Sequence, residues 1–386
     1  MDVKIFFSKV SEKIFSDIES NHSFFKNIFL PGPSFPDIKK ADVALIGLEE
    51  SRGSSRNEKA NMGANVIREK LYRLKKGVNR YKIVDLGNLR NGHSLDETNL
   101  RIKEVCRFLI DNDVFPLLFG GTHDLDVGLY QAYEDMEKLV SVLNVDAFID
   151  LGFDEKKERN HSHVNTILTH QPNYLFNFSQ VGYQSYLIDP DSLAMMEKLY
   201  FDTYRVGKLR QNISEMEPII RDADMLSFDI TAIRSSDAPG NVLAQPFGLT
   251  GEEACQLCWY AGLNEKLSAA GFFEYNPELD MYNYKTASVI ATMIWYFIEG
   301  FYHRKDHFSF KSNYYLKYVV SMPDDPDALI FYKSKLSEKW WMEVPYPNGK
   351  KVFDRNSIVP CSYADYQKAM LGEIPERWIH TQARLM

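Results

Sequence analysis

The sequence has little cysteine and no long apolar segment. Four of its 386 residues are cysteine, too few for a disulfide scaffold and typical of a protein kept in a reducing compartment. The most apolar stretch, residues 287–298, is shorter than the ~18 residues of a membrane span and contains Thr and Ser. The first residues lack the small-residue cleavage site of a signal peptide. These absences predict a cytoplasmic protein with no membrane partner.

An excess of basic charge is also missing. Lys and Arg together number 45 against 53 Asp and Glu, so the net charge is −8. Nucleic-acid binding needs a basic face that neutralises phosphates, and we therefore expect no nucleic-acid partner. A glycine-rich phosphate loop of the Walker or Rossmann type is absent, as is the Gly-x-Ser-x-Gly motif of serine hydrolases.

Short β-rich runs alternate with longer helical runs. Several of the β-rich runs, such as VALIG and PLLFG, are continuously apolar, as expected for parallel strands buried on both faces. The alternation predicts an α/β fold with three layers, in which helices cover both faces of a mainly parallel sheet. The predicted strands are 41–48, 81–87, 114–121, 140–146, 179–184, 224–230 and 271–276, and the predicted helices include 65–74, 97–112 and 251–270.

The alternation of predicted strands and helices gives way to other patterns near both ends of the sequence. Residues 1–40 read as an amphipathic helix followed by a Pro-rich linker, LPGPSFPD. After about residue 304, β-rich runs separated by Asp-Pro and Asn-Gly turns predict a small antiparallel unit closed by a helix. We therefore expect a main domain at 41–304 and a small C-terminal α+β appendage at 305–386.

Polar residues at the ends of the predicted strands are the candidates for a site, because ligands of open parallel sheets bind beyond the carboxyl ends of the strands. Taken one at a time, each of these residues is better explained as a turn or a core residue. The four clusters contain His123 after Gly120-Gly121, Asp146 with Asp150, Asp229 with Thr231, and Glu274.

In this order, the four clusters resemble the motifs of the ureohydrolase family, which comprises arginases, agmatinases, guanidinobutyrases and formimidoylglutamases, and the formimidoylglutamase branch is the nearest. The resemblance covers residues 40–300. It is carried by Gly120-Gly121-Thr122-His123-Asp124, Asp146-Ala147-Phe148-Ile149-Asp150, Ser227-Phe228-Asp229-Ile230-Thr231, Ala238-Pro239-Gly240, Gly248-Leu249-Thr250 and Glu274-Tyr275-Asn276-Pro277.

The resemblance implies a metal centre, but only half of its ligands are retained. Family members hold two divalent ions, usually manganese, with a bridging hydroxide that attacks the amidine or guanidine carbon. The ligands of one ion are all present, as His123, Asp146, Asp150 and Asp229. The second ion needs a His and an Asp of its own, where this sequence has Phe148 and Thr231. A phenyl ring has no lone pair and a Thr hydroxyl is a weak ligand, so we expect one metal ion at most, Mn²⁺ by resemblance. A site with no ion is the alternative.

Two further residues receive roles from the resemblance. Glu274 matches the family residue that receives the cationic end of the substrate. His163 is the predicted general acid/base histidine, with His161 as a competitor, although a surface histidine is the better explanation for either residue taken alone. The sequence thus suggests a hydrolase of C–N bonds in a small linear amidine or guanidino molecule. The alternative is an inactive relative, a pseudoenzyme that binds a ligand or partner in the same cleft. Oligomers are common in the family, and a homo-oligomer is compatible with this sequence.

Two other motifs have simpler explanations. Cys255-x-x-Cys258 lies within a predicted helix without a second Cys pair, which favours two core thiols over a redox or zinc site. Trp340 and Trp341 are adjacent on a predicted strand and face opposite ways, so we expect them to pack against the body or a neighbouring subunit rather than stack on a ligand.

Overall fold

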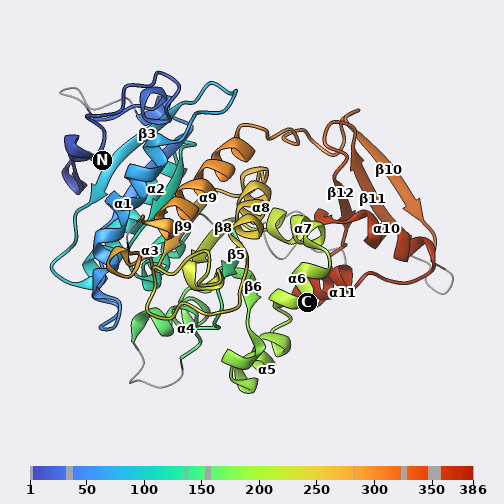
Figure 1. Cartoon of the computed structure of the whole chain (residues 1–386). Helices are drawn as coiled ribbons and strands as arrows, with labels where there is room; N and C mark the ends of the chain where they lie inside the picture. The colour runs from blue at the N-terminus through green and yellow to red at the C-terminus, as the bar shows by residue number, and fades with distance from the viewer. Residues whose placement is uncertain are drawn as a thin grey trace.

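The computed structural model describes residues 3–31, 38–134, 136, 138–152, 158–281, 283–322, 328–346 and 358–385. In this part of the chain, a nine-stranded sheet runs through the main body in the order β1-β3-β2-β4-β9-β8-β5-β6-β7 (Figure 1). All neighbouring strands are parallel except the edge strand β1, which pairs antiparallel with β3. The strands are β1 (Phe7–Ser8), β2 (Val43–Leu48), β3 (Ile83–Leu89), β4 (Phe115–Phe119), β5 (Val140–Val145), β6 (Leu175–Tyr183), β7 (Asp202–Arg205), β8 (Met225–Asp229) and β9 (Ala269–Phe273).

Helices cover both faces of this sheet, which confirms the predicted three-layer α/β/α fold. One buried cluster joins the sheet to α1, α6, α7, α8 and α9, and a second cluster joins the other face to α2, α3, α4 and α5. The helices of the body are α1 (Gly63–Arg73), α2 (Leu95–Ile110), α3 (Asp126–Gln131), α4 (His163–Thr169), α5 (Pro190–Lys198), α6 (Val206–Gln211), α7 (Met216–Arg221), α8 (Gly251–Gly262) and α9 (Lys285–Phe301).

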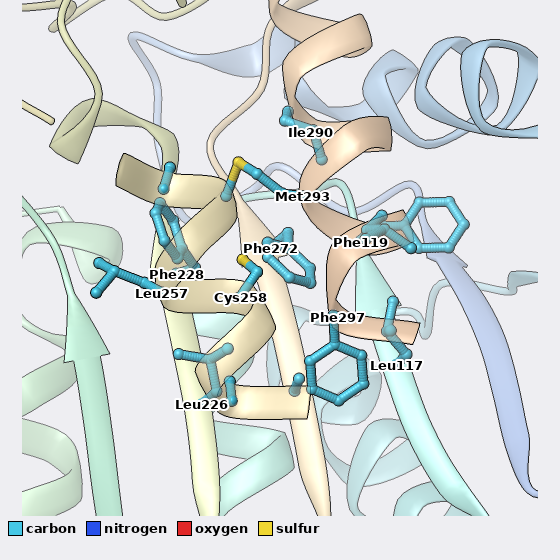
Figure 2. Packing of buried hydrophobic residues seen from close by; sticks show 14 of the residues in the cluster. Leu117, Phe119, Leu226, Phe228, Leu257, Cys258, Phe272, Ile290, Met293 and Phe297 are labelled. Atoms are coloured by element: carbon cyan, nitrogen blue, oxygen red, sulfur yellow. The ribbon is translucent and has the colours of Figure 1, made fainter. Parts of the chain in front are cut away.

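The strand β2 shows why its residues are apolar throughout. Val43 and Leu45 pack into the first cluster, whereas Ala44 and Ile46 pack into the second. Successive side chains of a strand point to opposite faces, so a strand covered on both sides must be apolar at every position. The same argument applies to the neighbouring central strands shown with α8 and α9 in Figure 2.

The helix predicted at 251–270 is shorter in the structure. Helix α8 ends at Gly262, and residues 269–270 already belong to β9. The side chain of Asn264 donates hydrogen bonds to the carbonyls of Ile220 (2.9 Å) and Ala223 (2.8 Å), which holds the chain in a turn after the helix. Tertiary hydrogen bonds of this kind override the helical propensity of the following residues.

The N-terminal segment contains no amphipathic α-helix within residues 3–31. It forms three-residue and four-residue 3-10 turns and the edge strand β1 instead. Val3 and Phe7 pack on one face of the sheet, while Phe15 stacks on Phe25 at 4.6 Å between ring centroids on the other. Its apolar residues therefore bind two separate surfaces, which a single helix stripe does not reach. Most of the predicted Pro-rich linker, residues 32–37, lies outside the described residues.

A separate four-stranded antiparallel sheet lies towards the C-terminus (Figure 1), in the order β10-β11-β12-β13. It packs with two helices around its own buried cluster. The division of the chain at residues 40 and 304 stays a prediction. The elements are β10 (Tyr315–Val320), β11 (Leu329–Ser334), β12 (Trp340–Glu343), β13 (Ile358–Cys361), α10 (Tyr363–Met370) and α11 (Glu376–Leu385).

Arg221, the last residue of α7, fixes this C-terminal unit to the body. Its guanidinium donates to the carbonyls of Trp340 (3.0 Å) and Cys361 (3.3 Å) and lies 4.2 Å from the ring centroid of Trp341. Trp340 stacks instead on Tyr366 within the unit. The two tryptophans thus face opposite ways, as predicted. A cavity of about 700 Å³ is lined by residues of both parts, among them Asp222, Pro360 and Arg377.

Two expectations from composition can be compared with the described residues. None of their helices combines the length and the apolar character required to cross a membrane. Cys255 and Cys258 are both buried in α8, and burial raises the pKa of both thiols. The interpretation of this motif as two core thiols is confirmed.

A buried ion pair holds α1 against β3. Arg68 donates to Asp85 through Nε (2.8 Å), and both side chains are fully buried. Further donors of the same guanidinium bind Asn65, Asn88 and the carbonyl of Gly87. Since a buried charge is tolerated only with a full set of partners, this network fixes the position of the helix on the sheet.

Replacing Arg68 with methionine should therefore lower the free energy of unfolding by about 3–5 kcal/mol, because Asp85 is left as a buried carboxylate without its cation. Urea unfolding followed by circular dichroism measures the change. Arg73→Met, on the same helix but with a partly exposed pair to Asp17, should change the stability by no more than about 0.5 kcal/mol. Equal effects of the two substitutions would contradict this account.

Candidate metal centre

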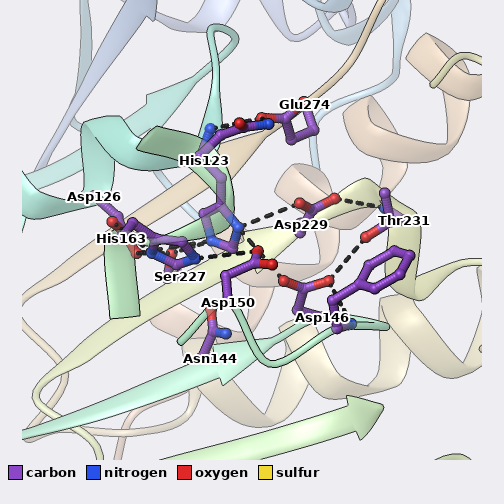
Figure 3. Close-up of polar contacts among 12 residues, drawn as sticks. His123, Asp126, Asn144, Asp146, Asp150, His163, Ser227, Asp229, Thr231 and Glu274 are labelled. Carbon is purple, nitrogen blue, oxygen red and sulfur yellow. Dashed lines mark hydrogen bonds and ion pairs between the residues drawn. The ribbon is translucent and has the colours of Figure 1, made fainter. Parts of the chain in front are cut away.

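The four predicted clusters meet at one edge of the sheet because their strands are neighbours. In the order β4-β9-β8-β5, His123 lies shortly after β4, Glu274 directly follows β9, Asp229 ends β8 and Asp146 directly follows β5. The carboxyl ends of parallel strands lie at the same edge. Figure 3 shows the resulting group of side chains.

The paired glycines after β4 make the turn that brings His123 into this group. Both have positive φ angles, +93° at Gly120 and +74° at Gly121. A Cβ atom on Gly120 would lie 2.7 Å from the carbonyl oxygen of Leu48, too close for any other residue type. The sequence-based reason for these glycines, a sharp backbone turn before the histidine, is confirmed.

Three of the four predicted ligands form a compact group, and a second histidine joins them. His123, Asp146, Asp150 and His163 each offer one ligand atom, and these atoms all lie within 4.8 Å of one another. Asp229 lies at the side of this group, with Oδ2 3.2 Å from Nδ1 of His123. Within the described residues, His123 Nδ1, Asp146 Oδ2 and His163 Nε2 are buried atoms without a hydrogen-bond partner. Buried polar atoms rarely lack partners unless another group binds them, so the residues fit a metal ion.

The two oxygens of Asp146 have different surroundings. Oδ1 accepts hydrogen bonds from the backbone N–H of Phe148 (3.0 Å) and from the hydroxyl of Thr231 (2.9 Å). Oδ2 points to the side of His123, 3.7 Å from its Nδ1. Asp229 is held in a similar way, since its Oδ1 accepts the backbone N–H of Thr231 (2.7 Å). Protein donors thus bind one side of these carboxylates and leave the other side to the histidines.

The pKa values of Asp146 and Asp150, the two aspartates that follow β5, shift in opposite directions. Burial, together with the negative charges of Asp229 and Asp150, raises the pKa of Asp146 well above its usual value. Burial also acts to raise the pKa of Asp150, but hydrogen bonds and charges from His161 and His163 outweigh it and lower the pKa. A cation near Asp146 relieves the repulsion that raises its pKa.

Glu274 is enclosed by donors. Its Oε1 accepts the backbone N–H of His123 (2.9 Å) and the amide of Asn160 (3.1 Å), and its Oε2 accepts the amide of Asn57 (2.7 Å). Its φ of +71° is a strained conformation for a residue with a side chain. Burial and the charge of Asp229 raise the pKa of Glu274 to about 7, against the effect of these hydrogen bonds.

The structure separates the two candidate histidines for proton transfer. His161 is half-buried, lines a small cavity together with Glu274 and Asp229, and has its Nδ1 3.5 Å from Asp150. The hydrogen bond to Asp150 raises the pKa of His161. His163 is fully buried and does not line this cavity. Burial lowers its pKa, but the charges of Asp126 and Asp150 outweigh burial and raise the pKa well above its usual value.

With this geometry established, comparison with known proteins identifies the family. A family model described as the arginase family matches residues 41–299, more than half of the chain. The chain belongs to the arginase family. The C-terminal sheet lies outside the matched residues.

Individual relatives of this arginase-family chain are distant. It is 24% identical over 294 residues to an arginase from Bacillus caldovelox, a match that covers 65% of this chain and 96% of the relative. It is 24% identical over 271 residues to a formimidoylglutamase from Rhodococcus jostii, with 65% and 83% of the two chains covered.

Solved structures show the same arginase-like fold. A formiminoglutamase from Trypanosoma cruzi with Mn²⁺ has a TM-score of 0.65 and 21% identity, covering 70% of this chain and 97% of that chain. The formimidoylglutamase from Bacillus subtilis has a TM-score of 0.65 and 19% identity, covering 76% and 98%.

Sequence reasoning missed several residues that build the centre of this arginase-family chain. Asp126 and Ser227 bind the two buried histidines, and Asn57 binds Glu274. Asp126 had one available signal, because it lies three residues after His123 and a helical turn brings such residues to one side. Ser227 was part of a quoted motif but received no role. Asn57 lies in a loop far from Glu274 in sequence, and only the fold brings them together.

Proposed function

We propose that this chain hydrolyses a C–N bond of a linear amidine or guanidino molecule, using one divalent metal ion at most. The observation that carries the proposal is the unequal use of Asp146. One oxygen is bound by Thr231 and Phe148. Among the residues that the structure describes, the other oxygen has no partner and lies beside Nδ1 of His123, which has none either. In a two-ion site both oxygens of such a residue are ligands. The Thr231 hydroxyl here occupies the oxygen that a second ion needs.

The residues for the single ion are those expected from the sequence, namely His123, Asp146, Asp150 and Asp229. Their imidazole and carboxylate groups suit Mn²⁺ and similar divalent ions. When bound, such an ion acts as a Lewis acid and lowers the pKa of a water molecule bound to it towards about 7. The relatives with arginase and formimidoylglutamase activities support hydrolysis as the reaction class.

Glu274 is the proposed acceptor for the positive end of the substrate. Its carboxylate is buried beside the cavity, and its negative charge suits the N–H groups of an amidinium or guanidinium. The hydrogen bonds from Asn57, Asn160 and His123 hold the carboxylate in one orientation, which reduces the entropy lost on binding.

The proton-transfer role predicted for His163 passes in our proposal to His161. A general acid must reach the nitrogen that leaves. His161 lines the cavity that Glu274 also lines, whereas His163 is enclosed behind the carboxylates. Asp150 orients the ring of His161 and favours its protonated form.

Arg56 favours a substrate that carries a carboxylate. It lines the same cavity, is exposed, and makes no hydrogen bond or ion pair with any described residue. A guanidinium binds a carboxylate through two parallel hydrogen bonds. We therefore propose an amidine with an acidic group, such as a formimidoyl amino acid or a guanidino acid, in preference to a simple polyamine.

The size of the cavity favours the second candidate, an inactive relative that binds a ligand or partner here. Its volume is about 10 Å³, close to that of one water molecule. A substrate therefore enters only when the loops that line it, around Ser54, His161 and Leu243, move apart. Catalysis requires this opening, whereas a pseudoenzyme that binds a partner over the closed loops does not.

Turnover on a panel of amidines separates the two candidates. We expect the purified protein, supplied with one equivalent of Mn²⁺, Co²⁺ or Zn²⁺, to release formamide, ammonia or urea from at least one of formimidoylglutamate, guanidinobutyrate, arginine and agmatine. Glu274→Gln should lower kcat/KM about 10- to 100-fold, because a hydrogen bond to a charged group is worth about 1.5–3 kcal/mol.

Glu278→Gln is the matched control, since Glu278 is exposed and pairs only loosely with Lys59. It should leave kcat/KM unchanged. Removal of the metal with a chelator should abolish turnover. A protein that holds its metal ion and hydrolyses none of these compounds would be the inactive relative instead.

Restoring both lost ligands tests the number of ions. In Phe148→His with Thr231→Asp, the metal content measured by elemental analysis should rise from one towards two ions per chain, because the second site regains an imidazole and a carboxylate. Phe148→Leu with Thr231→Val changes the same positions without adding ligands and should remain at one. Two ions in the unmodified protein would overturn the proposal.

The role of Arg56 predicts a selective change in KM. Arg56→Met should raise the KM for a carboxylate-bearing amidine about tenfold or more, since a charged hydrogen bond is lost. The KM for an amidine without a carboxylate should stay within a factor of two. Lys59→Met, a loss of positive charge on the neighbouring surface, serves as control. An equal change for both substrates would contradict the assignment.

A further inference from the structure

His163 is the buried histidine that the proposed ligand set does not use. Its side chain is 0% exposed, and its Nε2 has no hydrogen-bond partner among the described residues. This nitrogen lies 3.6 Å from Oδ2 of Asp150. Figure 3 shows the ring between Asp126 on one side and the carboxylates of the centre on the other. A buried imidazole nitrogen without a partner is unfavourable, so a binding partner is expected for it.

Asp126 fixes which nitrogen of His163 carries the proton. Both of its oxygens lie within hydrogen-bond distance of Nδ1, at 3.0 and 2.9 Å. A carboxylate accepts hydrogen bonds, so Nδ1 carries hydrogen in this contact. When the imidazole is neutral, Nε2 then presents a lone pair to the centre. The same carboxylate–histidine pair orients histidine ligands in many metal sites.

The carboxylate of Asp126 also orients His123, through the hydroxyl of Ser227. The hydroxyl of Ser227 donates to Oδ2 of Asp126 (2.9 Å) and accepts from Nε2 of His123 (2.8 Å). The other nitrogen of His123, Nδ1, is then the one with a free lone pair, and it too has no partner among the described residues. One buried carboxylate therefore directs a lone pair from each of two rings into the same space.

We propose that His163 is a metal ligand of this chain and that Asp126 is the positioning residue for both histidines. The inference rests on the single-ion site proposed above and adds to it a second imidazole, next to Asp146 and Asp150. Nε2 of His163 thus supplies one ligand atom, which partly compensates for the ligands missing at Phe148 and Thr231. With His163 added, two imidazoles and three carboxylates face the ion, and imidazole ligands favour transition metals such as Zn²⁺, Co²⁺ or Fe²⁺ over Mg²⁺ and Ca²⁺, which bind through oxygen.

The experiment measures binding of Co²⁺ and Zn²⁺ to the full chain by competition with a chromogenic chelator, together with X-ray absorption to count imidazole ligands. The wild-type protein should show two imidazoles around one ion. His163→Leu should show one imidazole and a metal affinity at least 100-fold lower. Asp126→Asn should keep the histidines but lower the affinity about 10- to 100-fold, as loss of an outer partner does in other sites.

His170→Leu is the matched control, because this histidine directly follows α4 but contacts Tyr130, Tyr174 and Glu134 instead of the metal centre. It should keep two imidazoles and a metal affinity within about threefold of the wild type. If His163→Leu does not fold, Asp126→Asn still tests the proposal. An unchanged affinity in Asp126→Asn, or an unchanged imidazole count in His163→Leu, would overturn it.

The outcome also distinguishes this inference from the proposed function. Loss of the ion in His163→Leu with no amidine turnover by the wild type would support the metal site and reject the hydrolase. If the wild type hydrolyses an amidine and His163→Leu still binds the ion as tightly, the hydrolase is supported and the role of His163 as a ligand is rejected. A wild-type protein that binds none of Mn²⁺, Co²⁺ and Zn²⁺ at one equivalent and turns over no amidine would reject both.

Discussion

Mutual repulsion among buried carboxylates is the constraint around which this centre is organised. Asp146, Asp150 and Asp229 lie together at the carboxyl ends of two neighbouring strands, where water does not reach them freely. The pKa of Asp146 rises because burial and the other two charges act in the same direction. Such a group is stable only if protons, donors or a cation balance it. Two histidines balance Asp150, and backbone N–H groups bind the other two aspartates.

Thr231 explains how the single-ion site proposed above stays balanced without a second cation. An aspartate at this position would add a fourth negative charge and require a second cation. A threonine adds no charge, and its hydroxyl supplies a hydrogen bond to the Asp146 oxygen that faces it. Phe148 adds no ligand through its phenyl ring, and its backbone N–H, which any residue at this position would supply, binds the same oxygen of Asp146. In the single-ion site proposed above, the neutral hydroxyl of Thr231 satisfies an oxygen that a second cation would otherwise have to balance.

The sequence allowed the sheet and most of the candidate ligands to be predicted, because both depend on local patterns. Continuous apolar runs identify buried parallel strands, and polar residues at their ends follow from strand topology. The short, polar edge strand β7 lacks such a run and was missed. The contact of His163 with Asp126 was missed for a different reason. The two residues lie 37 positions apart, and the orientation of an imidazole ring depends on packing, which leaves no pattern in a single sequence.

The contact of Arg221 with the C-terminal sheet has a mechanical consequence. Its guanidinium joins the carbonyls of β12 and β13 to the end of α7, and a short loop connects α7 to β8, the strand that carries Ser227 and Asp229. A cavity of about 380 Å³ lies directly at this contact and is lined by Arg221 and Trp341. Because only residues 222–224 separate Arg221 from β8, a displacement of the C-terminal unit at this contact would act on the strand beneath the carboxylates through three residues.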